Sequence, residues 1–158
     1  MRKSNQIFSG ALVAAAFATG SAVAAPTVVE LTQVACQFVE SENGVDHDFK
    51  TTQKADCEAI NAKNAENRLQ EAKPLQLKAG DYVFKVTNKD VPYMLGFWLR
   101  NKGYNPLNPV DKLTGTSVSG GGLNPGVTLD YDVTLKPGEY GYSCPMTTTS
   151  EYRMLAHG

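Results

Sequence analysis

The sequence predicts an all-β sandwich or barrel of the Greek-key type, with a short helical insertion near its start. In several short segments apolar residues recur at every second position, which is the period of a half-buried strand. Clusters of Gly, Pro, Asn and Asp separate these segments at spacings near ten residues. About seven or eight strands are therefore expected, and this pattern favours an antiparallel all-β fold over a parallel α/β arrangement.

Residues 1–24 have the pattern of a cleaved secretory signal peptide. Arg2 and Lys3 precede an apolar run over residues 11–19, and Ala22-Val23-Ala24 provides a small-residue cleavage site. The apolar run is too short to stay in a bilayer as a lasting anchor. We therefore expect one mature domain of residues 25–158, located in the periplasm.

The charge of the mature chain argues against nucleic acid as a partner. Without Arg2 and Lys3, 13 of the 15 basic side chains remain against 16 acidic ones, which gives a net charge of −3. No basic cluster is longer than a dipeptide, whereas nucleic-acid binding usually needs a basic patch.

The first third of the mature chain predicts strand, loop and helix in that order. Residues 26–40 are rich in β-formers and predict one strand, or two with a bend near Ala35. A polar segment follows. Asp56 is a candidate N-cap, and Pro74 must end the helix, so one or two short helices are expected within residues 56–72.

The rest of the chain alternates between apolar and polar residues, except in one segment. Residues 75–90, 94–100, 127–135 and 139–144 predict strands. The clearest set of alternating core positions is Val127, Leu129, Tyr131, Val133 and Leu135. Residues 101–126 are rich in Gly, Pro and Asn and predict a long excursion across the surface.

The mature chain contains three cysteines, and exported thiols tend to pair. We expect a disulfide between Cys36 and Cys57, because it would close a polar loop that has little else to hold it. In the chain-entropy model such a loop adds about 3 kcal/mol of stability. Cys144 is left over, and an unpaired thiol in an oxidising compartment is buried, metal-bound or reactive.

Three segments together resemble the cupredoxin family. They are LKAGDYVFKVTN at residues 77–88, GFWL at 96–99, and LNPGVTLDYDVTLKPGEYGYSC at 123–144. The surroundings of GFWL are also similar to the copper domain of cytochrome oxidase subunit two. The likeness covers about residues 75–156. It implies a cupredoxin-like sandwich with copper as its cofactor and Cys144 in the position of the copper cysteine.

The remaining copper ligands of that family have no clear counterparts. A blue copper centre uses two imidazoles, a thiolate and a weak axial ligand. The chain has no histidine after Asn88, where the family has its first, and after Cys144 none occurs before His157. The candidate metal ligands are Cys144, Met146, Met94, Met154 and His157. His47 is a further possible imidazole, although nothing in the sequence fixes its distance from Cys144.

The strand period weakens one pair of these candidates. Met154 and His157 are three residues apart, and residues three apart in a regular strand point to opposite faces. Both can reach one ion only if the strand bends or ends between them.

Two functions from different classes remain open. An enzyme is not expected, because the chain has no nucleophile triad, no HExxH motif and no phosphate loop. The first function is a small periplasmic copper protein that carries electrons or handles Cu(I). The second is a metal-free module that binds a partner in the cell envelope, such as a redox or copper-handling protein, with residues 101–126 as its adaptable surface.

Overall fold

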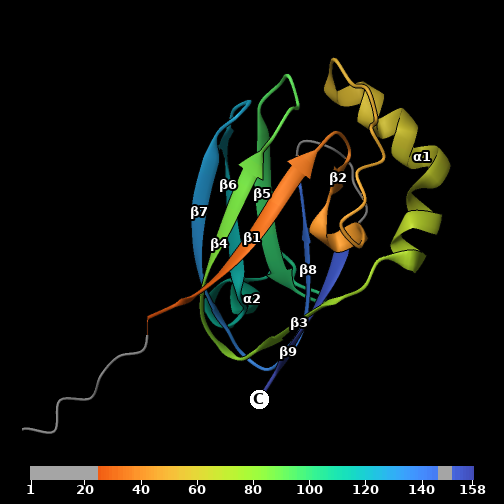
Figure 1. Ribbon diagram of the computed structural model, residues 1–158. Coiled ribbons are helices and arrows are strands. Elements are labelled where there is room, and N and C mark those ends of the chain that lie inside the picture. The colour runs from red at the N-terminus through yellow and green to blue at the C-terminus, as the bar shows by residue number, and fades with distance from the viewer. Residues whose placement is uncertain (1–24, 146–150) are drawn as a thin grey trace, which may run out of the picture.

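Two β-sheets face each other in the computed structural model, which describes residues 25–145 and 151–158 (Figure 1). The first sheet has the order β2–β1–β4–β7, built from Gln37–Phe38, Thr27–Val34, Gly80–Asn88 and Thr128–Leu135. The second has the order β3–β9–β8–β5–β6, built from Leu75–Lys78, Tyr152–His157, Gly138–Ser143, Leu95–Asn101 and Ser117–Leu123. The all-β prediction is confirmed, with nine strands in the described residues instead of seven or eight.

The predicted alternation of buried and exposed side chains is confirmed in β7. Tyr131, Val133 and Leu135 are buried, whereas Val127 and Leu129 are half-buried. The intervening polar residues Thr128, Asp130, Asp132 and Thr134 are exposed. β7 pairs antiparallel with β4, which has the same alternation. One face of this sheet therefore covers the core.

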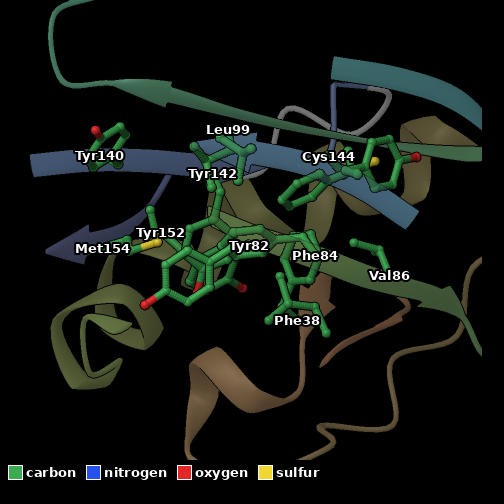
Figure 2. Close-up of a cluster of buried hydrophobic side chains, with 14 of the residues drawn as sticks. Phe38, Tyr82, Phe84, Val86, Leu99, Tyr140, Tyr142, Cys144, Tyr152 and Met154 are labelled. Carbon is green, nitrogen blue, oxygen red and sulfur yellow. The ribbon is translucent and has the colours of Figure 1, made fainter. Parts of the chain in front are cut away.

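Aromatic rings fill the space between the sheets. Phe38 is in edge-to-face contact with Phe97, Tyr142 and Tyr152, at centroid distances of 6.2, 5.6 and 5.6 Å. Phe84 stacks on Phe97 at 5.8 Å. Figure 2 shows that rings from both sheets converge on this cluster. Edge-to-face packing is a favoured geometry for aromatic pairs.

The first predicted strand divides at a sharp turn. β1 ends at Val34, and β2 returns antiparallel beside it from Gln37. Cys36 occupies the turn with a φ of 66°. The predicted bend near Ala35 is confirmed. β1 itself runs parallel to β4, so the chain crosses to the other end of the sheet before β4 begins.

The helical insertion is one helix, α1, over Lys54–Glu71. The prediction of Asp56 as its N-cap was wrong: the N-cap is Gln53. Asp56 lies in the first turn, and its carboxylate accepts hydrogen bonds from the backbone N–H groups of Thr52 and Gln53 at 2.7 and 3.1 Å. In a capping box, the carboxylate at the third helical position accepts hydrogen bonds from the backbone at the N-cap, so Asp56 lies within the helix that it caps.

Residues 101–126 are more regular than predicted. They contain α2 over Pro109–Thr114, capped by Asn108, and the whole of β6, which pairs with β5. The glycines that suggested a loop allow close packing within β6, since a Cβ on Gly120 would lie 3.0 Å from the Tyr131 ring. Lys136, in the turn after β7, reaches the Thr114 carbonyl, so α2 lies at the end of the sandwich where β1 begins. Within residues 25–145 and 151–158, no helix is long and apolar enough to cross a membrane.

Candidate functional site

Cys144 follows directly after β8, at the end of the sandwich opposite α2. Tyr140, Tyr142 and Cys144 are 1%, 0% and 5% exposed, so these alternate residues are all buried. Cys144 is a free thiol. In Figure 2 it lies at the edge of the aromatic cluster. The unpaired cysteine is therefore held inside the sandwich, close to its end.

A small cavity adjoins the Cys144 thiol. It has a volume of about 10 Å³, close to the minimum for one water molecule. Its lining residues are Gln33, Val34, Cys36, Gln37, Phe38, Leu95 and Cys144. Cys144 therefore borders the same small space as residues in and beside the β1–β2 turn.

Gln33, one of the residues that line this cavity, has an unsatisfied polar atom. Its side chain is 2% exposed. The Nε2 group donates to the Gly96 carbonyl at 2.9 Å, whereas Oε1 is buried without a hydrogen-bond partner among the described residues. A buried acceptor without a partner costs roughly 1–3 kcal/mol. Sequence reasoning missed Gln33, because nothing local to β1 marks it as different from the other polar residues there.

The loop from β4 to β5 is fixed by a buried asparagine. Asn88 is 0% exposed, and its amide donates to the carbonyls of Val91, Tyr93 and Leu123 at 3.3, 3.1 and 3.1 Å. Its Oδ1 accepts from the Val91 N–H at 3.0 Å. Met94 ends this loop and is 44% exposed. The segment that resembles the first-histidine region of cupredoxins is thus well ordered, with a thioether near the surface.

Two tyrosines lie within electrostatic reach of Cys144. Burial raises the pKa of Tyr131, and a negative charge on Cys144 raises it further. Burial also raises the pKa of Tyr93, although a hydrogen bond to Thr51 opposes the rise, and Cys144 contributes in the upward direction. The Phe38 ring also lines the cavity beside Cys144.

The structure does not bring Met154 or His157 to Cys144. Met154 pairs with Tyr140, four residues before Cys144, which corresponds to about 13 Å along a strand. Its side chain is fully buried, whereas His157 is exposed and its Nε2 lies 2.6 Å from Gln76 Oε1. β9 is regular through His157, so the bend that would let both side chains reach one ion is absent from it.

Of the candidates Met146 and His47, the structure describes only His47. Met146 lies outside the described residues. The His47 ring is directed to Glu42, with Nε2 2.8 Å from Oε2, and it stacks on Phe49 at 5.5 Å. Neither histidine is directed to the Cys144 cavity. No cluster of three or more His, Cys, Asp or Glu side chains suited to a metal occurs within residues 25–145 and 151–158.

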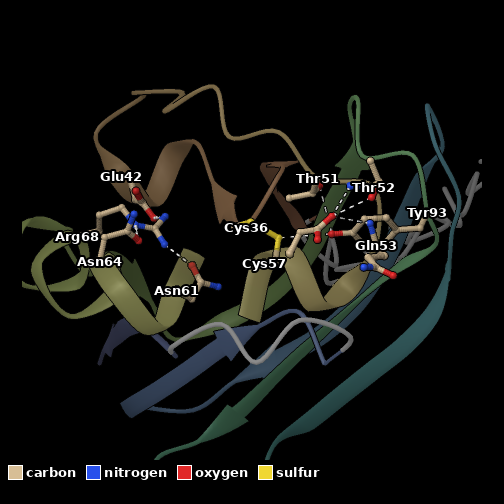
Figure 3. The surroundings of a disulfide bond; sticks show 11 residues. Cys36, Glu42, Thr51, Thr52, Gln53, Cys57, Asn61, Asn64, Arg68 and Tyr93 are labelled. Carbon is tan, nitrogen blue, oxygen red and sulfur yellow. Dashed lines mark hydrogen bonds and ion pairs between the residues drawn. A yellow bond between two sulfur atoms is a disulfide. The ribbon is translucent and has the colours of Figure 1, made fainter. Parts of the chain in front are cut away.

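The predicted disulfide is confirmed. Cys36 and Cys57 are bonded, with their Cα atoms 5.1 Å apart. The bond joins the β1–β2 turn to the first turns of α1 (Figure 3). The Tyr93 hydroxyl donates to Cys57 Sγ at 3.4 Å. The disulfide thus lies between the helix and the loop that carries Met94.

Comparison with known proteins supports the fold but not a family. No protein-family model matches the chain, and neither does any curated protein sequence. Auracyanin B is a similar solved structure, with a TM-score of 0.51 and 14% identity over 89% of this chain and 96% of that one. Auracyanin A, a "blue" copper protein from Chloroflexus aurantiacus, gives 0.47 and 12% over 84% and 99%. The likeness to auracyanin B shows a cupredoxin-like fold, as the sequence predicts.

Proposed function

We propose that this chain is an exported periplasmic copper protein that binds one Cu(I) through Cys144. Its role is to carry electrons or to handle Cu(I), and it is not an enzyme. One observation carries the proposal: Cys144, a buried free cysteine, lines the same small cavity as Gln33, whose Oε1 has no hydrogen-bond partner among the described residues, at the strand end where the cupredoxin resemblance predicts the copper cysteine. The signal-like pattern of residues 1–24 supports export.

The donor atoms near the cavity fit Cu(I) better than Cu(II). A thiolate is a soft ligand that selects Cu(I), whereas a blue Cu(II) centre also needs two imidazoles. His47 and His157 are engaged by Glu42 and Gln76 instead. Copper bound here would supply one-electron chemistry. Cys144 would hold the ion, Gln33 would offer a weak oxygen donor, and the exposed Met94 and the sequence neighbour Met146 are the candidate thioethers.

Anaerobic titration with Cu(I), in competition with a chelator of known affinity, tests this proposal. We expect one Cu(I) per mature chain and no intense blue absorption after oxidation. Cys144→Ser should abolish binding, and Gln33→Leu should weaken it. Met154→Leu is the matched control, because Met154 is buried on β9, the strand beside β8, but lies far from Cys144. The affinity of this variant for Cu(I) should be unchanged. Unchanged binding by Cys144→Ser would overturn the proposal.

An exposed apolar surface favours a second candidate function, the binding of a partner in the cell envelope. Leu107, Val110 and Leu113, in α2 and just before it, are 86%, 61% and 86% exposed. Large apolar side chains grouped in this way often mark interaction sites. They lie at the end of the sandwich opposite Cys144. If the mature protein binds no Cu(I), and if Leu107→Ser with Leu113→Ser abolishes capture of an envelope protein, the partner-binding function is favoured.

A further inference from the structure

Cys144 and Cys36, one half of the Cys36–Cys57 disulfide, lie at the same end of the sandwich. The Phe38 and Tyr142 rings are in contact at 5.6 Å and join β2 to β8. Cys36 lies two residues before Phe38, and Cys144 lies two residues after Tyr142. β2 and β8 run in opposite directions, so both steps lead to the same end of the sandwich. Cys36 and Cys144 accordingly line the same small cavity.

We propose that Cys144 exchanges with this disulfide inside the folded protein. The Cys144 thiolate attacks Cys36 Sγ, the Cys36–Cys57 bond breaks, and a Cys36–Cys144 disulfide forms. The electron pair of the broken bond leaves on Cys57 Sγ, which takes up the proton that Cys144 has lost. No external oxidant or reductant is consumed, because one disulfide and one thiol are present before and after the step.

The environment of Cys57 suits it to be the leaving group. Cys57 lies at the fourth position of α1, near the N-terminal end of an 18-residue helix, where the helix dipole stabilises negative charge. The Tyr93 hydroxyl already donates a hydrogen bond to Cys57 Sγ at 3.4 Å. Figure 3 shows this contact on the side of the disulfide that faces the helix start. A stabilised thiolate leaves faster in thiol–disulfide exchange.

Burial makes Cys144 the thiol best placed for this attack. Cys36 and Cys57 are 3% and 0% exposed, so a reductant in solution has little access to them. Cys144 already lines the same cavity as Cys36. The exchange would release α1 from the β1–β2 turn and tie the turn to β8 instead. It goes beyond the proposed function, and bound copper would prevent it by occupying the attacking sulfur.

Peptide mapping of the metal-free mature protein tests the exchange. The folded protein is held at pH 8.5 with a copper chelator and N-ethylmaleimide, which traps any released thiol; it is then acid-quenched, unfolded and digested. We expect maleimide on Cys57 together with a peptide that links Cys36 to Cys144. Tyr93→Phe should slow the appearance of label on Cys57 roughly tenfold, since a hydrogen bond to a charged group is lost. Tyr131→Phe, near Cys144 but not Cys57, is the control and should not slow it.

A second variant gives a result that does not depend on the position of the equilibrium. Cys57→Ser, refolded in a glutathione redox buffer, should form the Cys36–Cys144 disulfide and contain no free thiol. Cys36→Ser, treated in the same way, should keep both thiols free. Two free thiols in folded Cys57→Ser, or label confined to Cys144 in the wild type, would overturn the proposal. If Cys57→Ser does not fold, the wild-type mapping decides. Because copper is absent, failure here leaves the Cu(I) titration unaffected.

Discussion

Arg68 Nη1, on the buried face of α1, lies 3.0 Å from Glu42 Oε1 in the turn after β2. Both side chains are inaccessible, at 9% and 4% exposure. The Tyr152 hydroxyl donates to the same carboxylate, and the Arg68 guanidinium lies over the Phe49 ring at 5.0 Å. Glu42 and Arg68 together therefore join α1 to β9 and to the loop before the helix; Figure 3 shows their contact.

Arg68→Met should lower the free energy of unfolding by about 3–5 kcal/mol, because it removes the guanidinium from the buried Glu42 carboxylate and leaves it only the His47 ring and the Tyr152 hydroxyl as partners. Lys63→Met is the matched control: it removes an exposed cation from the same helix and should change stability by less than about 0.5 kcal/mol. Urea unfolding of the two variants measures the difference. Equal losses would mean that the pair contributes little.

The alternation in β7 predicts that substitutions on its buried face cost far more stability than substitutions on its exposed face. Leu135 is 2% exposed, and Leu135→Ala should cost about 2–5 kcal/mol through lost burial and a new cavity. Asp132 is exposed on the other face, and Asp132→Ala should change stability by less than about 0.5 kcal/mol. Thermal unfolding of both variants tests this. A large loss in Asp132→Ala would show that this face is also covered.

The sequence was most informative where burial follows a local period. The core positions of β7, the bend at Cys36 and the Cys36–Cys57 disulfide could all be inferred from residues close to one another in the chain. β6 could not, because its Ser- and Gly-rich sequence resembles a loop and becomes a strand only by pairing with β5.

The candidate site depended more on contacts between distant segments. The placement of Cys144 followed from the strand before it. The distances of Met154 and His157 from Cys144 depend on the register of β9 against β8, which no local pattern specifies. Gln33 likewise becomes part of the candidate site through a contact between distant segments. With its free acceptor, it lines the same cavity as Cys144 because the β1–β2 turn packs against the end of β8. The start of α1 was predicted three residues late because Asp56 acts from within the first turn.

We expect the protein to lose stability at alkaline pH because two tyrosine side chains, Tyr142 and Tyr152, are buried. Burial raises the pKa of Tyr142 and of Tyr152, and in Tyr152 the hydrogen bond and charge of Glu42 raise it further. Both groups ionise near pH 10 in the unfolded chain but stay protonated in the folded one. Stability is therefore complete below about pH 10 and falls above it, by about 1.4 kcal/mol per pH unit for each group.

Tyr142→Phe should remove one of these two contributions. Its unfolding free energy, measured in urea between pH 9 and 11, should decline less steeply than that of the wild type. At neutral pH the variant should lose about 1–3 kcal/mol, because the Ser41 hydroxyl, 2.5 Å from the Tyr142 hydroxyl, keeps no partner there. An unchanged slope above pH 10 would show that Tyr142 ionises without unfolding.

The chain after Cys144 packs closely against Gly96 in β5. A Cβ at Gly96 would lie 2.8 Å from the Gly120 carbonyl oxygen and 3.2 Å from Pro145 Cγ. The carbonyl belongs to β6 and cannot move freely, so Gly96→Ala should cost about 1–3 kcal/mol and displace Pro145. Displacement should expose the neighbouring Cys144 thiol. We expect this thiol to react faster with a chromogenic disulfide reagent than in the wild type.

Gly121→Ala is the matched control, because a Cβ there meets nothing within 4 Å. It should leave both stability and thiol reactivity unchanged, and equal effects of the two substitutions would contradict the packing of Pro145 on Gly96.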